Sequence, residues 1–297
     1  MELRQLRTFI AAAESQNFTR AAEAVSLTQA AVSQQIAALE TSLEVSLFQR
    51  DGRSVVLTGE GRQLYQYARR ILDLIDEARQ AVGGKQAALD GPLRIAASSV
   101  PAELLLPELL AEFRTRYPQI RETVIVSDSA DANRTVARGE ADVGFVGELS
   151  QTAKLTARPI GDDELVLVIA PNHPFAERKR VTLKRLCREP LIFREPGSGS
   201  RRCVERALEA EGITLDELNI VMVTNSNDSI RSAVERNVGI AFLSKPTIAS
   251  ELADGRLATL TVQTLRPRRQ LYLITNPERI PPRPARAFLE FIEERFS

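Results

Sequence analysis

The segment from residue 18 to residue 40 restricts the fold of this chain more than any other part of it. Two short helical patterns lie in this segment, joined by a brief interruption. In the second pattern Val32, Ile36 and Leu39 recur at spacings of four and three, the period of a helix that is buried along one side. The first pattern has a small apolar face at Ala21–Ala22, which suits two helices that cross steeply. The segment therefore predicts a helix-turn-helix.

The outer face of the second helix is short, polar and uncharged. It is formed by Gln29, Ala30, Ser33, Gln34 and Ala37. A solvated helix face of this length usually carries glutamate and lysine pairs, whereas short amide and hydroxyl side chains suit a helix that enters the DNA major groove and contacts base edges. The same periodicity fits a compact three-helix piece of a larger helical domain, so periodicity alone leaves both interpretations open.

Residues around the two helices favour the DNA-binding interpretation. Thr19 and Thr28 stand where the helices should begin, and Ser26 is an alternative cap for the second helix. Hydroxyls at helix N-termini can also meet DNA phosphates. Further on, the turn Arg50–Arg53 carries two arginines and precedes the short strand Ser54–Leu57, which predicts a small β-wing beside the helices.

Residues 3–61 resemble the DNA-binding domain of the LysR-type transcriptional regulators. The matching stretches are Leu3–Phe9, Asn17–Ala22, Thr28–Ile36, Leu47–Arg50 and Leu57–Gly61. The resemblance implies a winged helix-turn-helix that binds double-stranded DNA at a dyad-symmetric promoter site, as a dimer or tetramer, with RNA polymerase as a candidate partner. The expected contacts are Gln29, Ser33 and Gln34 to bases, Thr19, Thr28 and Thr58 to phosphates, and Arg50 and Arg53 from the wing.

The charge of this segment is unusual for a DNA-binding domain. Residues 1–60 hold five arginines, no lysine and seven acidic residues, a net charge of −2. Nucleic-acid-binding domains are usually basic, because a positive field supplies most of the nonspecific affinity. Affinity must therefore come from a few placed arginines, from helix N-termini and from the pairing of two heads, and we expect modest nonspecific binding.

The next segment predicts a long helix that pairs the heads. Its apolar residues have the alternating spacing of a coiled-coil seam: Leu64, Ala68, Ile71, Ile75, Ala78 and Val82. Gly83-Gly84 interrupts the pattern and Asp90–Pro92 ends it. A dimerising linker helix explains a seam between two globular parts, and an amphipathic helix packed on its own domain is the alternative.

From residue 93 onward, strands and helices alternate. The expected strands are Leu93–Ala97, Glu122–Ser127, Ala141–Val146, Leu165–Ala170, Leu191–Phe193, Ile220–Val223, Gly239–Leu243 and Gln270–Thr275. This order predicts an α/β class with parallel sheets and helices on both faces. The resemblance implies a two-lobed effector domain like the periplasmic binding proteins, with the chain crossing between lobes near Gly161–Asp163 and Leu265–Pro267.

The expected organisation joins these parts. The all-α winged helix-turn-helix takes residues 1–58 and the linker helix with its hinge residues 59–90. Lobe I of the effector domain takes 91–163 plus 266–297, and lobe II takes 164–265. A length of 297 residues with 43% hydrophobic residues suits two or three packed domains.

Three strand ends carry polar residues that predict a shared ligand cleft. Ligands bind at the carboxyl ends of strands in open α/β sheets. The candidates are Ser98, Ser99, Gly147, Glu148, Arg194, Gly197, Ser198, Gly199, Ser200, Arg201, Asn225 and Ser226. Each stretch alone also reads as a helix cap or a flexible loop. Hydroxyls, glycine amides and arginines suit an anion, and Ser98, Ser99, Ser198, Ser200 and Arg201 are the expected donors.

The family resemblance extends to this cleft. Gly197–Arg201 is similar to the Gly-Ser-Gly-Thr-Arg of LysR-type subgroups tied to sulfur assimilation, sulfite handling and carbon fixation. The effectors of those subgroups are commonly anionic. The resemblance therefore implies a regulator that senses a small anionic metabolite; a solute-binding module without a regulatory role is the alternative.

Catalysis finds little support in the sequence. His173, the only histidine, lies between prolines and is expected to be structural, and Cys203 is expected to be a reduced thiol, with redox sensing as the alternative. No metal-ligand spacing or phosphate-loop motif is present, so we expect no enzyme activity, metal or cofactor. Two cysteines and the lack of a membrane-spanning apolar run favour a cytoplasmic protein without a membrane partner.

Overall fold

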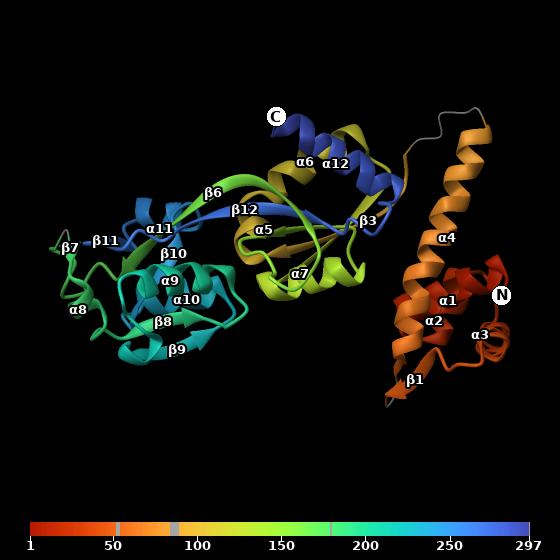
Figure 1. Ribbon diagram of the computed structural model, residues 1–297, viewed down its shortest axis with the longest axis horizontal. Helices are drawn as coiled ribbons and strands as arrows, with labels where there is room; N and C mark the ends of the chain where they lie inside the picture. The colour runs from red at the N-terminus through yellow and green to blue at the C-terminus, as the bar shows by residue number, and fades with distance from the viewer. Residues whose placement is uncertain (52–53, 84–88, 179, 297) are drawn as a thin grey trace. The chain divides into compact units, whose positions relative to one another are not determined.

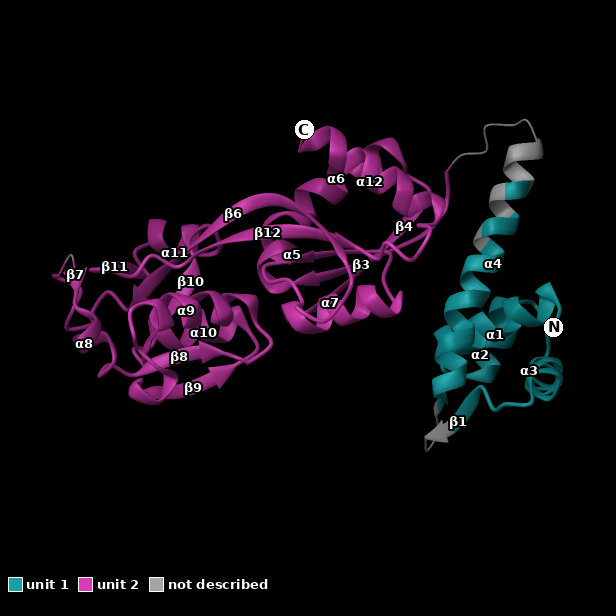
Figure 2. Ribbon diagram, in the orientation of Figure 1, with its two compact units in different colours: residues 1–88 teal, residues 89–297 magenta. Residues whose placement is uncertain are grey.

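The computed structural model describes residues 1–51, 54–83, 89–178 and 180–296 (Figure 1). The chain forms two compact units, Met1–Ala88 and Leu89–Ser297 (Figure 2). Each unit is described by itself below.

The first unit is a helical head with a β-hairpin. Its elements are α1 (Leu3–Ser15), α2 (Phe18–Ala24), α3 (Gln29–Leu43), β1 (Phe48–Asp51), β2 (Ser54–Leu57) and α4 (Gly59–Gly83), and β1 pairs antiparallel with β2. Val32 and Leu39 of α3 are fully buried and Ile36 is nearly so, which confirms the predicted inner face. Ala21 and Ala22 are buried beside them in one core. The predicted helix-turn-helix and wing are therefore present.

The start of α2 differs from the prediction. The cap is Asn17, whose Oδ1 accepts the backbone N–H of Thr19 at 2.8 Å and that of Arg20 at 3.2 Å. Thr19 lies inside the first turn, because the asparagine side chain two residues earlier already satisfies the free amides there. The prediction that Thr19 caps this helix was wrong. Thr28 caps α3 as predicted, with its Oγ1 accepting the N–H of Ala31 at 3.2 Å.

The linker helix α4 packs the first part of the predicted seam inside the head and carries a separate exposed apolar face. Ala68 is fully buried in the core of the head, with Leu64 and Ile71 packed against the same core. That part of the seam therefore packs on its own domain. Two large apolar residues that the prediction did not include, Tyr67 and Leu74, are 55% and 60% exposed. Their spacing of seven places them on one free face of α4.

The second unit is built on one continuous mixed sheet. In lobe I the strand order is β4 (Ile120–Ser127), β3 (Gly91–Ser98), β5 (Val143–Val146), β12 (Arg268–Thr275) and β6 (Thr156–Ile169); in lobe II β6 continues to β10 (Ile240–Ser244), β8 (Leu191–Arg194) and β9 (Ile220–Thr224). The strands β11 (Ala258–Val262) and β7 (Arg180–Val181) extend lobe II from β6.

The passage between the lobes corrects the expectation of purely parallel sheets. Residues 156–164 of β6 pair with β12, whereas residues 165–169 pair with β10 and β11, and all these pairs are antiparallel. A strand that runs out to one lobe and a strand that returns must point in opposite directions. The chain therefore passes between Glu164 and Leu165 within one unbroken strand, slightly beyond the predicted break at Gly161–Asp163.

Helices cover both faces of each half of the sheet, as predicted. In lobe I, α6 (Leu106–Arg116) and α12 (Arg283–Arg295) bury one face and α7 (Ser129–Arg138) the other. Phe113 of α6 packs edge-on against Phe288 of α12, with ring centroids 4.9 Å apart. In lobe II, α9 (Gly199–Ala210) and α10 (Asn227–Glu235) contribute to separate cores. Short helices α5 (Ser99–Leu104), α8 (Leu183–Leu186) and α11 (Ala249–Ala253) complete the unit.

Candidate functional sites

The outer face of α3 is free to contact DNA. Gln29 and Gln34 are exposed and Ser33 is half-buried, and the Nε2 of Gln29 donates to the Oγ of Ser33 at 3.3 Å. Gln35 points inward, because its Oε1 accepts the hydroxyl of Thr8 at 2.7 Å. Gln29 and Ser33, two of the three residues expected to contact bases, thus lie on one surface.

The candidate phosphate contacts have different environments. Thr19 and Thr28 are exposed. The hydroxyl of Thr58 donates to the carbonyl of Ser46 at 2.7 Å and accepts the N–H of Gly61 at 2.9 Å, so it serves to begin α4. Glycine at position 61 lets the start of α4 lie close to the Leu47 backbone, since a Cβ at that position would be 2.0 Å from the carbonyl oxygen of Leu47.

The wing is attached to the head at two points. The rings of Phe9 and Phe18 lie 5.4 and 5.5 Å from that of Phe48 in β1, and the N–H of Val55 donates to the carbonyl of Gln16 at 3.1 Å. The side chain of Arg50 and all of Arg53 lie outside the described residues, so their predicted role in the wing stays a prediction.

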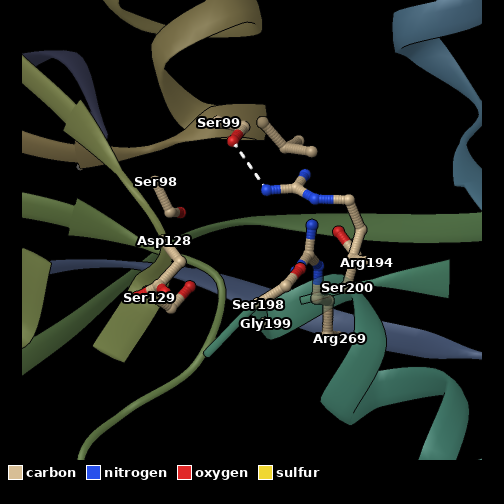
Figure 3. A pocket seen from close by; sticks show the side chains of 10 residues that line it. Ser98, Ser99, Asp128, Ser129, Arg194, Ser198, Gly199, Ser200 and Arg269 are labelled. Carbon is tan, nitrogen blue, oxygen red and sulfur yellow. Dashed lines mark hydrogen bonds between the residues drawn. The ribbon is translucent and has the colours of Figure 1, made fainter. Parts of the chain in front are cut away.

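A polar hollow lies between the two lobes of the second unit (Figure 3). Its volume is about 190 Å³, including space that is open to solvent. It is lined by Ser98, Ser99, Val100, Asp128, Ser129, Arg194, Ser198, Gly199, Ser200 and Arg269. The N-termini of α5 and α7 reach it from lobe I and that of α9 from lobe II. Six of the twelve predicted effector contacts line this hollow.

Arg194 joins the lobes across the hollow. It is 5% exposed, and its Nε and Nη2 donate to the carboxylate of Glu195, each at 2.8 Å. Nη1 donates to Asn227 Oδ1 at 2.5 Å, and Nη2 donates to the hydroxyl of Ser99 in lobe I at 3.2 Å. Glu195 therefore neutralises the charge of Arg194, which leaves hydrogen bonding as its main contribution to the hollow.

A second buried arginine, which the sequence analysis missed, forms another wall. Arg269 of β12 donates from Nε to Asp163 Oδ2 at 2.8 Å, and the hydroxyl of Ser244 donates to Asp163 Oδ1 at 2.6 Å. Asp163 stands opposite Arg269 in the strand register, next to the passage between lobes. The signal was present in the sequence, because Arg269 is in phase with the inward-facing Leu271 and Leu273.

The other predicted effector contacts lie outside the lining of the hollow. The backbone N–H of Gly147 donates to Ser98 Oγ, a residue of the lining, at 3.3 Å. Gly197 lies against Asp128, where a Cβ would come within 2.1 Å of the carboxylate. Ser226 caps α10 by accepting the N–H of Ser229 at 3.1 Å. Asn225 is exposed in the same loop, and Asn227, two residues later, contacts Arg194 instead.

Arg201 and Glu148 have partners of their own. Arg201 donates to Glu205 at 2.7 Å and to the carbonyl of Arg194 at 3.0 Å, with its guanidinium 5.8 Å from the ring centroid of Phe193. It lines a neighbouring, mainly apolar hollow in lobe II. Glu148 of lobe I accepts two hydrogen bonds from Arg206 of α9, at 2.6 and 3.0 Å.

Several contacts hold the two lobes against each other. Besides Glu148 and Arg206, the carboxylate of Glu103 in α5 pairs with Arg231 in α10 at 2.8 Å. The N–H of Ala130 donates to the carbonyl of Gly197 at 3.3 Å. The described structure is therefore one in which the lobes are in contact around the hollow.

The histidine and Cys203 are buried. His173 is buried, accepts the N–H of Phe175 through Nδ1 at 3.2 Å, and packs edge-on against that ring. Cys203 is 3% exposed, and burial raises the pKa of its thiol to about 11, so the reactive thiolate is scarce at neutral pH. Among the described residues, no group of three potential ligands is arranged to hold a metal ion. None of the described helices is long and apolar enough to cross a membrane.

Comparison with known proteins agrees with both units. Residues 3–62 match the family model for bacterial regulatory helix-turn-helix proteins of the lysR family, and residues 86–297 match the model for the LysR substrate binding domain. The HTH-type transcriptional regulator CbbR of Xanthobacter flavus is 35% identical over 294 residues, covering 98% of this chain and 87% of that protein.

Two solved structures are similar at 25% identity. The full-length regulator CbnR complexed with its target DNA covers 99% of this chain and 99% of that one, with a TM-score of 0.65. The regulatory domain of CcmR from Synechocystis PCC6803, in complex with 2-PG, covers 70% of this chain and 98% of that domain, with a TM-score of 0.64.

Proposed function

This chain belongs to the LysR family of transcriptional regulators, and we propose that it senses a small organic anion in the hollow between its two lobes. The family consists of DNA-binding regulators with a ligand-binding regulatory domain. The alternative of a solute-binding module without a DNA role finds no support, because the similarity to CbbR spans the head as well. We further propose that the protein acts in the cytoplasm, without catalytic activity of its own.

The observation that carries the anion proposal is the convergence of helix N-termini on one hollow. The first turns of α7 and α9 face it from opposite lobes, with the shorter α5 beside them. Unpaired amides and the helix dipole make such N-termini favourable for negative charge. The serine hydroxyls around them add donors, and the described lining contains one carboxylate, that of Asp128.

The CcmR complex with 2-PG supports the same ligand class. Since Glu195 and Asp163 neutralise the two arginines, selectivity in this chain depends on hydrogen bonds rather than on a strong positive field. We therefore expect a small carboxylated or phosphorylated metabolite with several oxygen acceptors.

Calorimetric titration of the full-length protein tests this ligand class. Acetate, inorganic phosphate, 2-PG and a set of organic acids are compared with neutral and cationic metabolites of similar size. We expect at least one anion to bind, and Ser200→Ala to weaken it, because the Ser200 hydroxyl is buried in the hollow. Saturable binding of neutral or cationic compounds alone would contradict the proposal.

For the head, we propose that Gln29, Ser33 and Gln34 contact bases, that Thr19, Thr28 and Thr58 contact phosphates, and that Arg50 and Arg53 contact DNA from the wing. The support is the exposed polar surface of α3 and the exposure of Thr19 and Thr28 at the helix starts. The proposed domain boundaries are 1–58, 59–90, 91–163 plus 266–297, and 164–265. The change of pairing partners after Glu164 supports the division between the lobes.

LysR regulators form oligomers, and the free face of α4 is the proposed contact between copies. Leu74→Glu places a charge on the exposed apolar face that Leu74 shares with Tyr67. We expect the dissociation constant of the dimer to rise by about tenfold or more, because a central apolar contact is replaced by a buried charge. Light scattering after size exclusion measures the mass. Leu74→Met is the control and should keep the mass of the wild-type oligomer. An unchanged mass for Leu74→Glu would exclude this face as the contact between copies.

A further inference from the structure

We propose that the anionic group of the effector is held in an inner subsite formed by Ser129, Arg269 and Gly199, deeper than the serines that the sequence predicts. This inference rests on the proposed function, and it identifies which donors recognise the charged group. Each of the three residues comes from a different element: Ser129 from α7, Arg269 from β12 and Gly199 from α9.

Ser129 provides a hydroxyl that has no partner. Its side chain lines the hollow (Figure 3), the residue is 1% exposed, and no described residue accepts or donates a hydrogen bond at its Oγ. Buried hydroxyls are nearly always hydrogen-bonded, because leaving one unpaired away from water costs free energy. An unpaired hydroxyl that faces a ligand hollow therefore indicates a ligand oxygen at this position.

Arg269 provides an oriented donor. Nε and Nη2 both face the carboxylate of Asp163, at 2.8 Å each. Nη1 makes no hydrogen bond to the described residues and lies where two glycine backbones approach. A Cβ on Gly147 would be 2.5 Å from Nη1, and a Cβ on Gly199 would be 3.0 Å from it. Asp163 and the glycines thus hold one guanidinium N–H toward the interior of the hollow.

Gly199 brings the third donor to the same point. The Cβ position of Gly199 is also 2.7 Å from Ser129 Oγ, so its backbone passes within a few ångströms of both other donors. It is the first residue of α9, where the backbone N–H has no partner within the helix. A hydroxyl and a guanidinium N–H therefore lie beside the Gly199 backbone, and we infer that its amide N–H is the third donor to the same small volume.

Three donors around one point select an acceptor. The carboxylate of Asp128 is the nearest acidic group in the lining, but its Oδ1 already accepts the N–H of Asp131 at 2.7 Å, as the cap of α7. A carboxylate or phosphate oxygen satisfies all three donors at once. A carboxylate group and a phosphate group can both supply such an oxygen. Titration with acetate and with inorganic phosphate distinguishes the two.

The test is calorimetric titration of the full-length protein with acetate, inorganic phosphate and 2-PG. Ser129→Ala should weaken binding by about tenfold to a hundredfold, the value of one hydrogen bond to a charged group. The same change should leave the melting temperature of the ligand-free protein unchanged or higher, because it removes an unsatisfied hydroxyl. A purely structural role would instead lower the melting temperature. Ser229→Ala, in the first turn of α10 and exposed, is the matched control.

Gly199→Ala is the second variant and fills the subsite with a methyl group. We expect it to abolish binding, while Gly161→Ala, whose Cβ meets no atom within 4 Å, has no effect. If acetate binding is the more sensitive to Ser129→Ala, the inner group is a carboxylate; if phosphate binding is, it is a phosphate.

The results separate this inference from the proposed function. Wild-type affinity for these anions in both Ser129→Ala and Gly199→Ala would overturn the inner subsite and leave the anion proposal standing. If none of the three anions bound the wild-type protein, the inner subsite would fall, and the proposed function would fall with it only if the other organic acids also failed to bind.

Discussion

A chain that carries Gln29→Ala together with Ser33→Ala is expected to lose specific binding to the DNA upstream of its own gene. The two side chains lie on the free face of α3 and contact each other at 3.3 Å. Each base contact contributes roughly 1–3 kcal/mol of discrimination, so the double change should weaken specific binding by on the order of 30-fold to 10⁴-fold. Alanine is the best helix former, and Thr28 still caps α3, so the head should stay folded.

A mobility-shift titration at fixed salt concentration measures this loss. The matched control is Thr41→Ala with Ser42→Ala, two hydroxyl residues at the far end of the same helix. The control should bind as the wild type does, and anion binding should be unaltered in both variants. Wild-type affinity in the Gln29 and Ser33 variant would show that another surface reads the DNA.

The second large effect is expected at the buried ion pair beside the passage between lobes. Asp163→Ala leaves the guanidinium of Arg269 without its counter-charge, with the two side chains 1% and 4% exposed. Removing one partner of a buried pair costs about 3–5 kcal/mol, because the remaining charge is left uncompensated. We therefore expect the free energy of unfolding of the effector unit to fall by this amount.

Urea denaturation of the full-length protein measures the change. Glu164→Gln is the control. Glu164 is the next residue of the same strand and pairs with Arg268 at the surface, so its substitution should lower the free energy of unfolding by less than about 1 kcal/mol. Asp163→Leu with Arg269→Met removes both charges and should recover part of the loss. An Asp163→Ala variant as stable as Glu164→Gln would show that the pair does not hold the lobes' connecting strands.

The parts of the structure that local patterns control were predictable from sequence. Val32, Ile36 and Leu39 define the inner face of α3 by spacing alone, and Thr28 caps that helix where its type and position indicated. The strand end at Ser98 and the loop that follows β8 as far as Ser198 lie at the hollow, because loops at the carboxyl ends of parallel strands meet at one edge of a sheet.

The parts that depend on packing between distant segments were not predictable. The free face of α4 is set by the burial of Ala68 against α1, so a seam counted along the sequence could not show that Tyr67 and Leu74 stay exposed. The burial of Arg269 follows from its phase with Leu271 and Leu273, but its meeting with Ser129, 140 residues away in the chain, does not. Antiparallel β6 and β12 likewise follow from the need to leave one lobe and return, which no local pattern encodes.

Effector binding should act on DNA through the placement of the lobes. Arg194 contacts Ser99, and Arg206 contacts Glu148, across the hollow, so a ligand that fills it interacts with both lobes at once. A ligand shifts a conformational equilibrium only by its difference in affinity for the two states. Thermodynamic linkage then requires DNA to change anion affinity by the same factor as the anion changes DNA affinity.

The most direct measurement is the binding of labelled upstream DNA to the full-length protein, followed by anisotropy and gel mobility while the anion found by calorimetry is added. We expect the DNA affinity or the mobility of the complex to change, with half of the change at the anion's own dissociation constant. Ser129→Ala should move that midpoint to a higher anion concentration. Identical affinity and mobility with and without saturating anion would contradict a ligand-responsive regulator.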